Sequence, residues 1–184
     1  MSTKPLLLLD VDGVVNAFSP DRPHTVHTVD FGRTNKGVPQ SYTLHFDNEV
    51  VMMIEALQDH FDVVWCTMWN QSANSRLAPL LGIEDMPVMH CSHDAGLDVL
   101  DSQGIRWEGA RRLWYAKTPL IPSYVGNTPF VWIDDDHSDA DRRYLAAQMD
   151  QPFRLIKTDA YDGLTWDDVN AAIAFARTLN PTSV

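Results

Sequence analysis

Cysteine, long hydrophobic runs and basic residues are all scarce in this sequence, and each shortage excludes a class of protein. Two cysteines in 184 residues, Cys66 and Cys91, are too few for a disulfide-stabilised secreted scaffold. The longest apolar run near the N-terminus, Pro5–Leu9, is too short for a signal peptide or a membrane span. We therefore expect a cytoplasmic protein with buried free thiols and no membrane partner.

Positive charge is low: 14 Lys and Arg stand against 25 Asp and Glu, and the formal net charge is −11. Sequence-independent binding to nucleic acid depends on many Lys and Arg contacts with phosphate, so this balance argues against nucleic acid as a partner. The chain is still 45% hydrophobic, enough for a folded core. No repeat or linker-like stretch divides it, and we expect one domain over residues 1–184.

Glutamate is rare among the acidic residues, with four Glu against 21 Asp. Aspartate favours caps, turns and metal sites over helix interiors, and most of these residues fit a solvated acidic surface. Two clusters do not fit, because each follows an apolar run directly. They are Asp10 with Asp12, and Asp134 with Asp135 and Asp136.

Apolar runs alternate with helical patterns along the chain. Short continuous runs predict buried strands at Leu6–Leu9, Val63–Cys66 and Phe130–Ile133, with weaker ones at Phe153–Ile156 and Pro87–Met89. Capped periodic segments predict helices at Asn48–His60, Ala73–Leu81, Ser138–Met149 and Thr165–Leu179. This alternation indicates an α/β fold, a Rossmann-like three-layer sandwich with a mostly parallel central sheet. The segment Phe18–Phe46 interrupts it with strand-like alternation around turn-forming residues, which predicts a small β-hairpin flap after the first strand; a disordered loop is the alternative.

The Asp clusters follow predicted strands, and ligands of open parallel sheets bind at the carboxyl ends of the strands. Folding can bring both clusters to one rim, where their charges would repel unless a cation neutralised them. A small all-oxygen ligand set indicates Mg²⁺, which shares its coordination shell with water and substrate phosphate. We therefore expect Mg²⁺ as the cofactor.

Four segments, in order, resemble the motifs of the haloacid dehalogenase (HAD) superfamily, whose members are mostly Mg²⁺-dependent phosphohydrolases. The segments are LLLLDVDGVV from Leu6, VVWCT from Val63, WYAKT from Trp114 with Lys117, and FVWIDD from Phe130. Family members differ by inserted cap domains. Here the first insertion site holds only the predicted flap, and the second, Gly82–Trp114, shows no clear domain. The resemblance therefore implies a HAD-type phosphatase that is capless or minimally capped.

The resemblance also implies roles. Asp10 would be the nucleophile that forms an aspartyl-phosphate, and Asp12 would protonate the leaving oxygen and then deprotonate the hydrolytic water. Thr67 would hydrogen-bond the transferring phosphoryl group, and Lys117 would hold that group and Asp10 in place. Asp10, the backbone carbonyl of Asp12 and Asp135 would bind Mg²⁺, with Asp134 acting through water or from behind the direct ligands.

Some assignments stay open at this point. The extra Asp leaves the fourth motif ambiguous by one residue, so Asp136 or Asp139 could take the place of Asp135. Arg111 and Arg112 could take the place of Lys117, but as neighbours on a polar stretch they fit a solvated surface better. Three further residues lie near the expected phosphate: Gly13, where the chain turns sharply, and Trp69 with Asn70, which could shape a substrate pocket or only pack.

The expected substrate is a small phosphorylated metabolite or nucleotide. One alternative is a nucleic-acid end-processing phosphatase, because an open site accepts bulky substrates. Its basic residues would be Arg33, Lys36, Arg106, Arg111 and Arg112. Another alternative is a non-catalytic binding module that kept the fold. The presence of every motif residue argues against it. A phosphotransferase would differ only in the final acceptor, and the sequence predicts neither the physiological substrate nor the oligomeric state.

Overall fold

A four-stranded parallel sheet lies at the centre of the computed structural model, which describes residues 4–18, 25–33, 36–105 and 116–179. The strand order is β4-β1-β5-β6. The strands are β1 (Leu6–Leu9), β4 (Asp62–Trp65), β5 (Phe130–Asp134) and β6 (Phe153–Lys157). All three neighbouring pairs are parallel, as crossovers through helices require.

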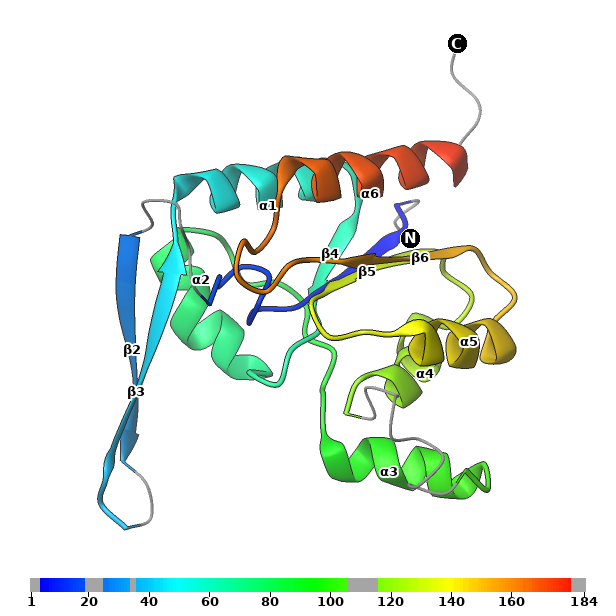
Figure 1. Ribbon diagram of the computed structural model, residues 1–184, viewed down its shortest axis with the longest axis horizontal. Helices are drawn as coiled ribbons and strands as arrows, with labels where there is room; N and C mark the ends of the chain where they lie inside the picture. The colour runs from blue at the N-terminus through cyan, green and yellow to red at the C-terminus, as the bar shows by residue number, and fades with distance from the viewer. Residues whose placement is uncertain (1–3, 19–24, 34–35, 106–115, 180–184) are drawn as a thin grey trace.

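Helices cover both faces of this sheet, which confirms the three-layer α/β prediction (Figure 1). Successive strand residues point to opposite faces, so each strand feeds two hydrophobic clusters. Leu7 and Leu9 belong to the cluster that includes residues of α1 (Asn48–His60) and α6 (Trp166–Leu179). Leu8 and Trp132 belong to the cluster that includes residues of α4 (Ile121–Val125) and α5 (Asp139–Gln148).

Helix ends follow the predicted caps. The Asp47 side chain accepts a hydrogen bond from the Glu49 backbone N–H at 2.9 Å, and Ser138 with Asp141 forms a capping box at the start of α5. The predicted helix Ala73–Leu81 is divided into a π-helix, Ala73–Leu77, and the short α2, Ala78–Leu81. Pro79 lacks the N–H that would continue a regular ladder, and Gly82 ends the segment at φ 70°.

Two predictions about the middle of the chain were wrong or incomplete. Pro87–Met89 forms no strand; Val88 makes one isolated bridge to Trp65. Three elements were not predicted, namely α3 (His93–Ser102), the 3₁₀ turn Thr118–Leu120 and α4. Helix α3 contains Gly96 and three aspartates, residue types with low helix propensity, so its sequence resembles that of a loop. Arg106, Arg111 and Arg112 lie outside the described residues.

The predicted flap is an antiparallel hairpin of β2 (Thr25–Arg33) and β3 (Pro39–Phe46), with a bulge between Asp30 and Gly32. It extends to one side of the sheet in Figure 1, away from α5. Its inner end returns to the body through Leu44 and Phe46, which are buried in the α1 side of the core. None of the helices in the described ranges is long and apolar enough to cross a membrane.

Candidate active site

Three neighbouring strands deliver the predicted site residues to one rim of the sheet. Asp10 follows β1 directly, Thr67 comes two residues after β4, and Asp134 ends β5. Because β1 lies between β4 and β5 and all three run parallel, their carboxyl ends open on the same side. Thr67 lies 57 residues after Asp10 and 67 residues before Asp134, and sheet topology alone brings the three residues to one site.

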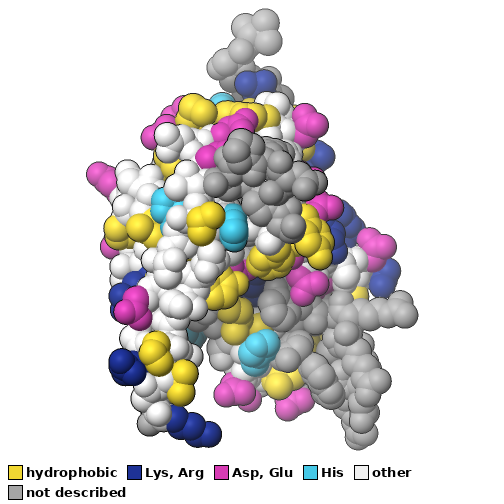
Figure 2. Space-filling model, turned by 60° about the vertical axis from the view of Figure 1, so that its left-hand side comes forward, with side chains coloured by type: hydrophobic (Ala, Val, Ile, Leu, Met, Phe, Trp, Pro, Cys, Tyr) yellow, Lys and Arg dark blue, Asp and Glu magenta, His cyan; other side chains and the backbone are white. Residues whose placement is uncertain are grey.

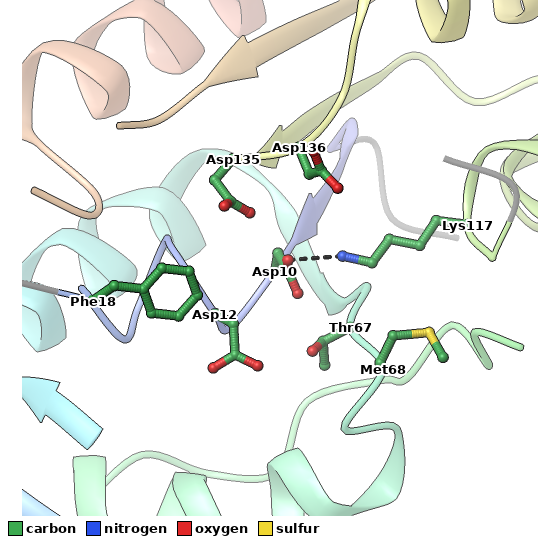
Figure 3. Close-up of a pocket in the computed structure, with 8 residues that line it drawn as sticks. All are labelled: Asp10, Asp12, Phe18, Thr67, Met68, Lys117, Asp135 and Asp136. Carbon is green, nitrogen blue, oxygen red and sulfur yellow. Dashed lines mark ion pairs between the residues drawn. The ribbon is translucent and has the colours of Figure 1, made fainter. Parts of the chain in front are cut away.

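A pocket of about 260 Å³ opens at this rim. Figure 3 shows its lining side chains converging from separate segments of the chain. The lining includes every residue that the resemblance assigned to direct chemistry, namely Asp10, Asp12, Thr67, Lys117 and Asp135, together with Phe18, Met68 and Asp136. Asp134, Trp69 and Asn70 do not line it.

Lys117 is buried between two carboxylates. Its Nζ lies 2.8 Å from Asp10 Oδ2 and 2.7 Å from Asp134 Oδ2, and its side chain is 1% exposed. Burial alone would lower the pKa of Lys117, but the charges of Asp10 and Asp134 outweigh it and raise this pKa well above its usual range. The ammonium is therefore a permanent positive charge on the pocket wall.

Asp10 is 6% exposed, and its Oδ1 accepts a hydrogen bond from the Val11 backbone N–H at 2.7 Å. Burial raises the pKa of Asp10 to about 7, an effect that Lys117 opposes and the Asp134 charge reinforces. Four carboxyl groups line the pocket, those of Asp10, Asp12, Asp135 and Asp136, and they outnumber the single ammonium of Lys117. Such a site favours a bound cation.

The three consecutive aspartates differ sharply in burial: Asp134 is buried, Asp135 is half-buried and Asp136 is exposed. Asp134 is fully buried and accepts hydrogen bonds from Lys117 Nζ, from Trp132 Nε1 at 3.2 Å and from the Asp136 backbone N–H at 2.9 Å. Asp135 faces the pocket, where burial and then the charge of Asp10 raise its pKa to about 6. Carboxylate oxygens of Asp10, Asp134 and Asp135 lie within 4.8 Å of one another, a donor set suited to a hard divalent cation.

Gly13 has two reasons to be glycine. Its φ is +73°, which side chains other than glycine rarely adopt, and a Cβ there would lie 2.6 Å from Asp135 Oδ2. The turn after β1 therefore presses directly against the Asp135 carboxylate. This contact joins the first and fourth motifs at the pocket floor.

Three side chains among the described residues donate hydrogen bonds to Asp12, and two of them were not predicted to lie there. Asn16 Nδ2 and Tyr42 Oη donate to Asp12 Oδ1, at 3.0 and 3.2 Å, and Trp69 Nε1 donates to Oδ2 at 2.8 Å. Burial, followed by the charge of Asp12, raises the pKa of Tyr42 to about 12, so the phenol keeps its proton and donates. Tyr42 stands 30 residues from Asp12, and no spacing in the sequence could have indicated the contact.

Asn70 and Thr118 do not line the pocket, but their hydrogen bonds hold the loops beside it in place. Asn70 exchanges two hydrogen bonds with the Cys91 backbone, at 2.8 and 3.0 Å, and adopts φ 48°. Thr118 Oγ1 donates to the buried Asp141 at 2.6 Å, which fastens the Lys117 segment to the start of α5. Asp139 is the first residue of α5, and the pocket lining does not include it.

Comparison with known proteins identifies a matching family. A family model described as the HAD domain in Swiss Army Knife RNA repair proteins matches residues 6–169. No curated protein sequence matches the chain at a significant level.

Three solved structures resemble the chain weakly. A hypothetical protein of Xanthomonas campestris has 13% identity and a TM-score of 0.37, over 97% of this chain and 85% of its own. The 3-deoxy-D-manno-octulosonate 8-phosphate phosphatase of Moraxella catarrhalis, in complex with magnesium, phosphate and KDO, has 16% identity and a TM-score of 0.35. The match covers 95% of this chain and 86% of that phosphatase. A probable YrbI family phosphatase of Pseudomonas syringae has 16% identity and a TM-score of 0.36, over 98% of this chain and 94% of its own. Identities and TM-scores this low assign no activity or substrate.

Proposed function

The chain belongs to the family of HAD domains found in Swiss Army Knife RNA repair proteins, and from this membership and the pocket we propose that it is a Mg²⁺-dependent phosphomonoesterase that acts through an aspartyl-phosphate. The observation that carries the proposal is the convergence of Asp10, Asp12, Thr67, Lys117 and Asp135 on one pocket. A binding module that had lost catalysis would have no need of all five.

In the proposed reaction, a carboxylate oxygen of Asp10 attacks phosphorus. The new P–O bond forms as the ester P–O bond breaks, and Asp12 gives its proton to the leaving oxygen. Water then attacks the phosphorus of the aspartyl-phosphate and passes a proton to Asp12, while the bond between phosphorus and the Asp10 oxygen breaks. Phosphate is released and the Asp10 carboxylate is restored. Lys117 and the Thr67 hydroxyl stabilise the charge that develops on the phosphoryl oxygens.

The donor set fits a divalent cation. Asp10, Asp135 and the backbone carbonyl of Asp12 would hold Mg²⁺ directly, and Asp134 would orient the site from behind because its oxygens already accept three hydrogen bonds. A bound Mg²⁺ supplies positive charge that offsets the repulsion between a phosphate and the carboxylates.

The proposed substrate is a small phosphorylated metabolite or a nucleotide. Two apolar side chains flank the pocket, Phe18 at 47% and Met68 at 39% exposure. Figure 3 shows them on opposite sides of Asp12 and Thr67. Apolar walls beside a phosphate site suit a leaving group with an apolar or planar face, which a nucleotide base offers.

A second candidate is a phosphatase that acts on RNA ends, which the occurrence of this family in RNA repair proteins favours. The exposed residues Arg33 and Lys36 lie at the outer end of the hairpin, where Figure 2 shows Lys and Arg side chains. A polynucleotide that extends from the pocket along the hairpin would meet these charges. The formal charge of −11 over the whole chain opposes this candidate.

The test is release of phosphate from a panel of esters. The panel holds p-nitrophenyl phosphate, sugar phosphates, nucleoside 3′- and 5′-monophosphates, and oligoribonucleotides with a 3′- or 5′-phosphate. We expect turnover with Mg²⁺, none with EDTA, and none for Asp10→Asn, because an amide cannot act as the nucleophile. Preference for the oligoribonucleotides over the mononucleotides would favour the second candidate. Inactivity of the folded protein on every ester would overturn both.

A further inference from the structure

Asp12 and the β2–β3 hairpin are connected through a small polar and aromatic cluster. Tyr42 lies on β3, Trp69 lies in the loop after β4, and Asn16 follows the first motif; all three donate hydrogen bonds to the Asp12 carboxylate. The donors therefore come from three separate segments. A carboxylate held from three directions has little rotational freedom.

The orientation of the Asn16 amide is fixed by the hairpin. Its Oδ1 accepts a hydrogen bond from the His45 backbone N–H on β3 at 2.8 Å, so its Nδ2 faces Asp12. The amide is buried, with 2% exposure, and both of its ends have partners. Displacement of β3 would thus remove the reason for Asn16 to point its donor at Asp12.

Trp69 is held against the same hairpin by two ring contacts. Its ring meets Phe31 of β2 at a centroid distance of 5.1 Å and Tyr42 at 5.4 Å, both edge to face. Aromatic pairs prefer this geometry. The indole N–H is thereby aimed at Asp12 by residues of the hairpin rather than by its own loop alone.

Proton transfer needs one lone pair of Asp12 to face the pocket. Oδ1 accepts two hydrogen bonds, from Asn16 and Tyr42, whereas Oδ2 accepts only the bond from Trp69 among the described residues. A carboxylate oxygen has two lone-pair directions. Oδ2 is therefore the oxygen left to carry the proton toward the leaving group and to receive it from water.

We propose that Asn16, Tyr42 and Trp69 are positioning residues that aim Asp12 Oδ2 for proton transfer, and that the hairpin is in this way part of the reaction centre. The inference rests on the proposed function, because it assigns the residues a part in that reaction. It adds a specific dependence: the more the leaving group needs a proton, the more the rate depends on the hydroxyl of Tyr42 and the indole N–H of Trp69.

The test compares esters whose leaving groups differ in their need for that proton. We expect Tyr42→Phe and Trp69→Phe to lower kcat/KM for an alkyl phosphate by about tenfold, a fraction of what a general acid supplies. For p-nitrophenyl phosphate, whose phenolate leaves without a proton, the loss should be smaller than about threefold. Phenyl phosphate should fall between the two.

Matched controls separate positioning from packing. Tyr124→Phe removes the hydroxyl of a tyrosine on α4 that is as exposed as Tyr42, 39% against 38%. Trp166→Phe removes another indole N–H that donates to a carboxylate, that of Glu49 at 2.9 Å. Neither residue lines the pocket, and both variants should keep the wild-type rates on all three esters. Thermal unfolding of each variant checks that it is folded.

An equal loss on all three esters, or no loss on any, would overturn the positioning roles while leaving the phosphatase proposal intact. Inactivity of the wild-type protein on every ester would overturn the proposed function itself. The two failures are therefore distinct.

Discussion

Lys117 carries its charge where water is excluded, between Asp10 and Asp134. Its removal has two consequences. The phosphoryl group loses a fixed positive charge, and two buried carboxylates lose their cation. Breaking a buried ion pair by deleting one partner typically costs about 3–5 kcal/mol, since the remaining charge stays desolvated.

We therefore expect Lys117→Ala to lower turnover by about two orders of magnitude or more, the scale for one preorganised charge-stabilising donor. The variant should also unfold at a lower temperature. Lys117→Arg should restore activity only in part, because a planar guanidinium does not reproduce a compact ammonium. Arg177→Ala, a charge removal on the exposed side of α6, is the control for both measurements. Wild-type turnover by Lys117→Ala would rule out the assigned role.

Single residues were predictable where they follow a strand. Asp10, Asp12, Thr67 and Asp135 stand at fixed offsets from apolar runs, and Lys117 fits a motif in the expected order. Their side chains share the pocket, although what each does there stays a prediction. Asn16 and Tyr42 stand outside any such pattern, because their contact with Asp12 depends on how the hairpin folds back onto the loop.

At the level of the element, the turn after β1 depends on Gly13. Gly82 at the end of α2 has nearly the same backbone, φ +70° against +73°, but no atom within 4 Å of where its Cβ would be. The pair therefore separates backbone strain from steric collision. An alanine at Gly82 meets only the strain, about 1–2 kcal/mol for a left-handed residue.

Gly13→Ala should destabilise the protein more than Gly82→Ala, because its Cβ must also displace the Asp135 carboxylate. It should abolish most phosphatase activity and weaken the stabilisation that Mg²⁺ confers. Gly82→Ala should keep both. Thermal unfolding with and without Mg²⁺, together with turnover of p-nitrophenyl phosphate, measures these effects. Equal behaviour of the two variants would mean that the contact with Asp135 is unimportant.

Elements were predictable where the apolar pattern and the intrinsic propensity of the residues favour the same structure. The four sheet strands and α1 bury continuous or periodic apolar residues, and their positions agree with the sequence pattern to within about two residues. Helix α3 contains Gly96 and three aspartates, which have low helix propensity, and it was missed. The π-helix Ala73–Leu77 was read as regular helix, because the buried residues Ala73, Leu77 and Leu81 stand four apart as in a regular helix and only the hydrogen bonding differs.

For the molecule as a whole, the charge of the pocket couples folding to pH and metal. The pKa of Asp10 is raised to about 7 and that of Asp135 to about 6, mainly by burial. Without metal, the folded state thus holds protons that the unfolded chain releases near pH 4. Stability from these groups is present below pH 4 and is lost as pH rises through 6 and 7.

Mg²⁺ binds carboxylates rather than carboxylic acids, so at low pH it must displace protons, whereas at high pH it neutralises charges that destabilise the fold. A ligand of the folded state raises its stability according to its affinity. We therefore expect a fixed Mg²⁺ concentration to raise the unfolding temperature more at pH 8 than at pH 5.5, as measured by circular dichroism. Asp135→Asn should lose most of this shift, and Asp150→Asn, an exposed acid beyond α5, should keep it. A shift that was equal at both pH values would mean that Mg²⁺ stabilises the protein without engaging the buried carboxylates, and would remove the pocket from consideration as the metal site.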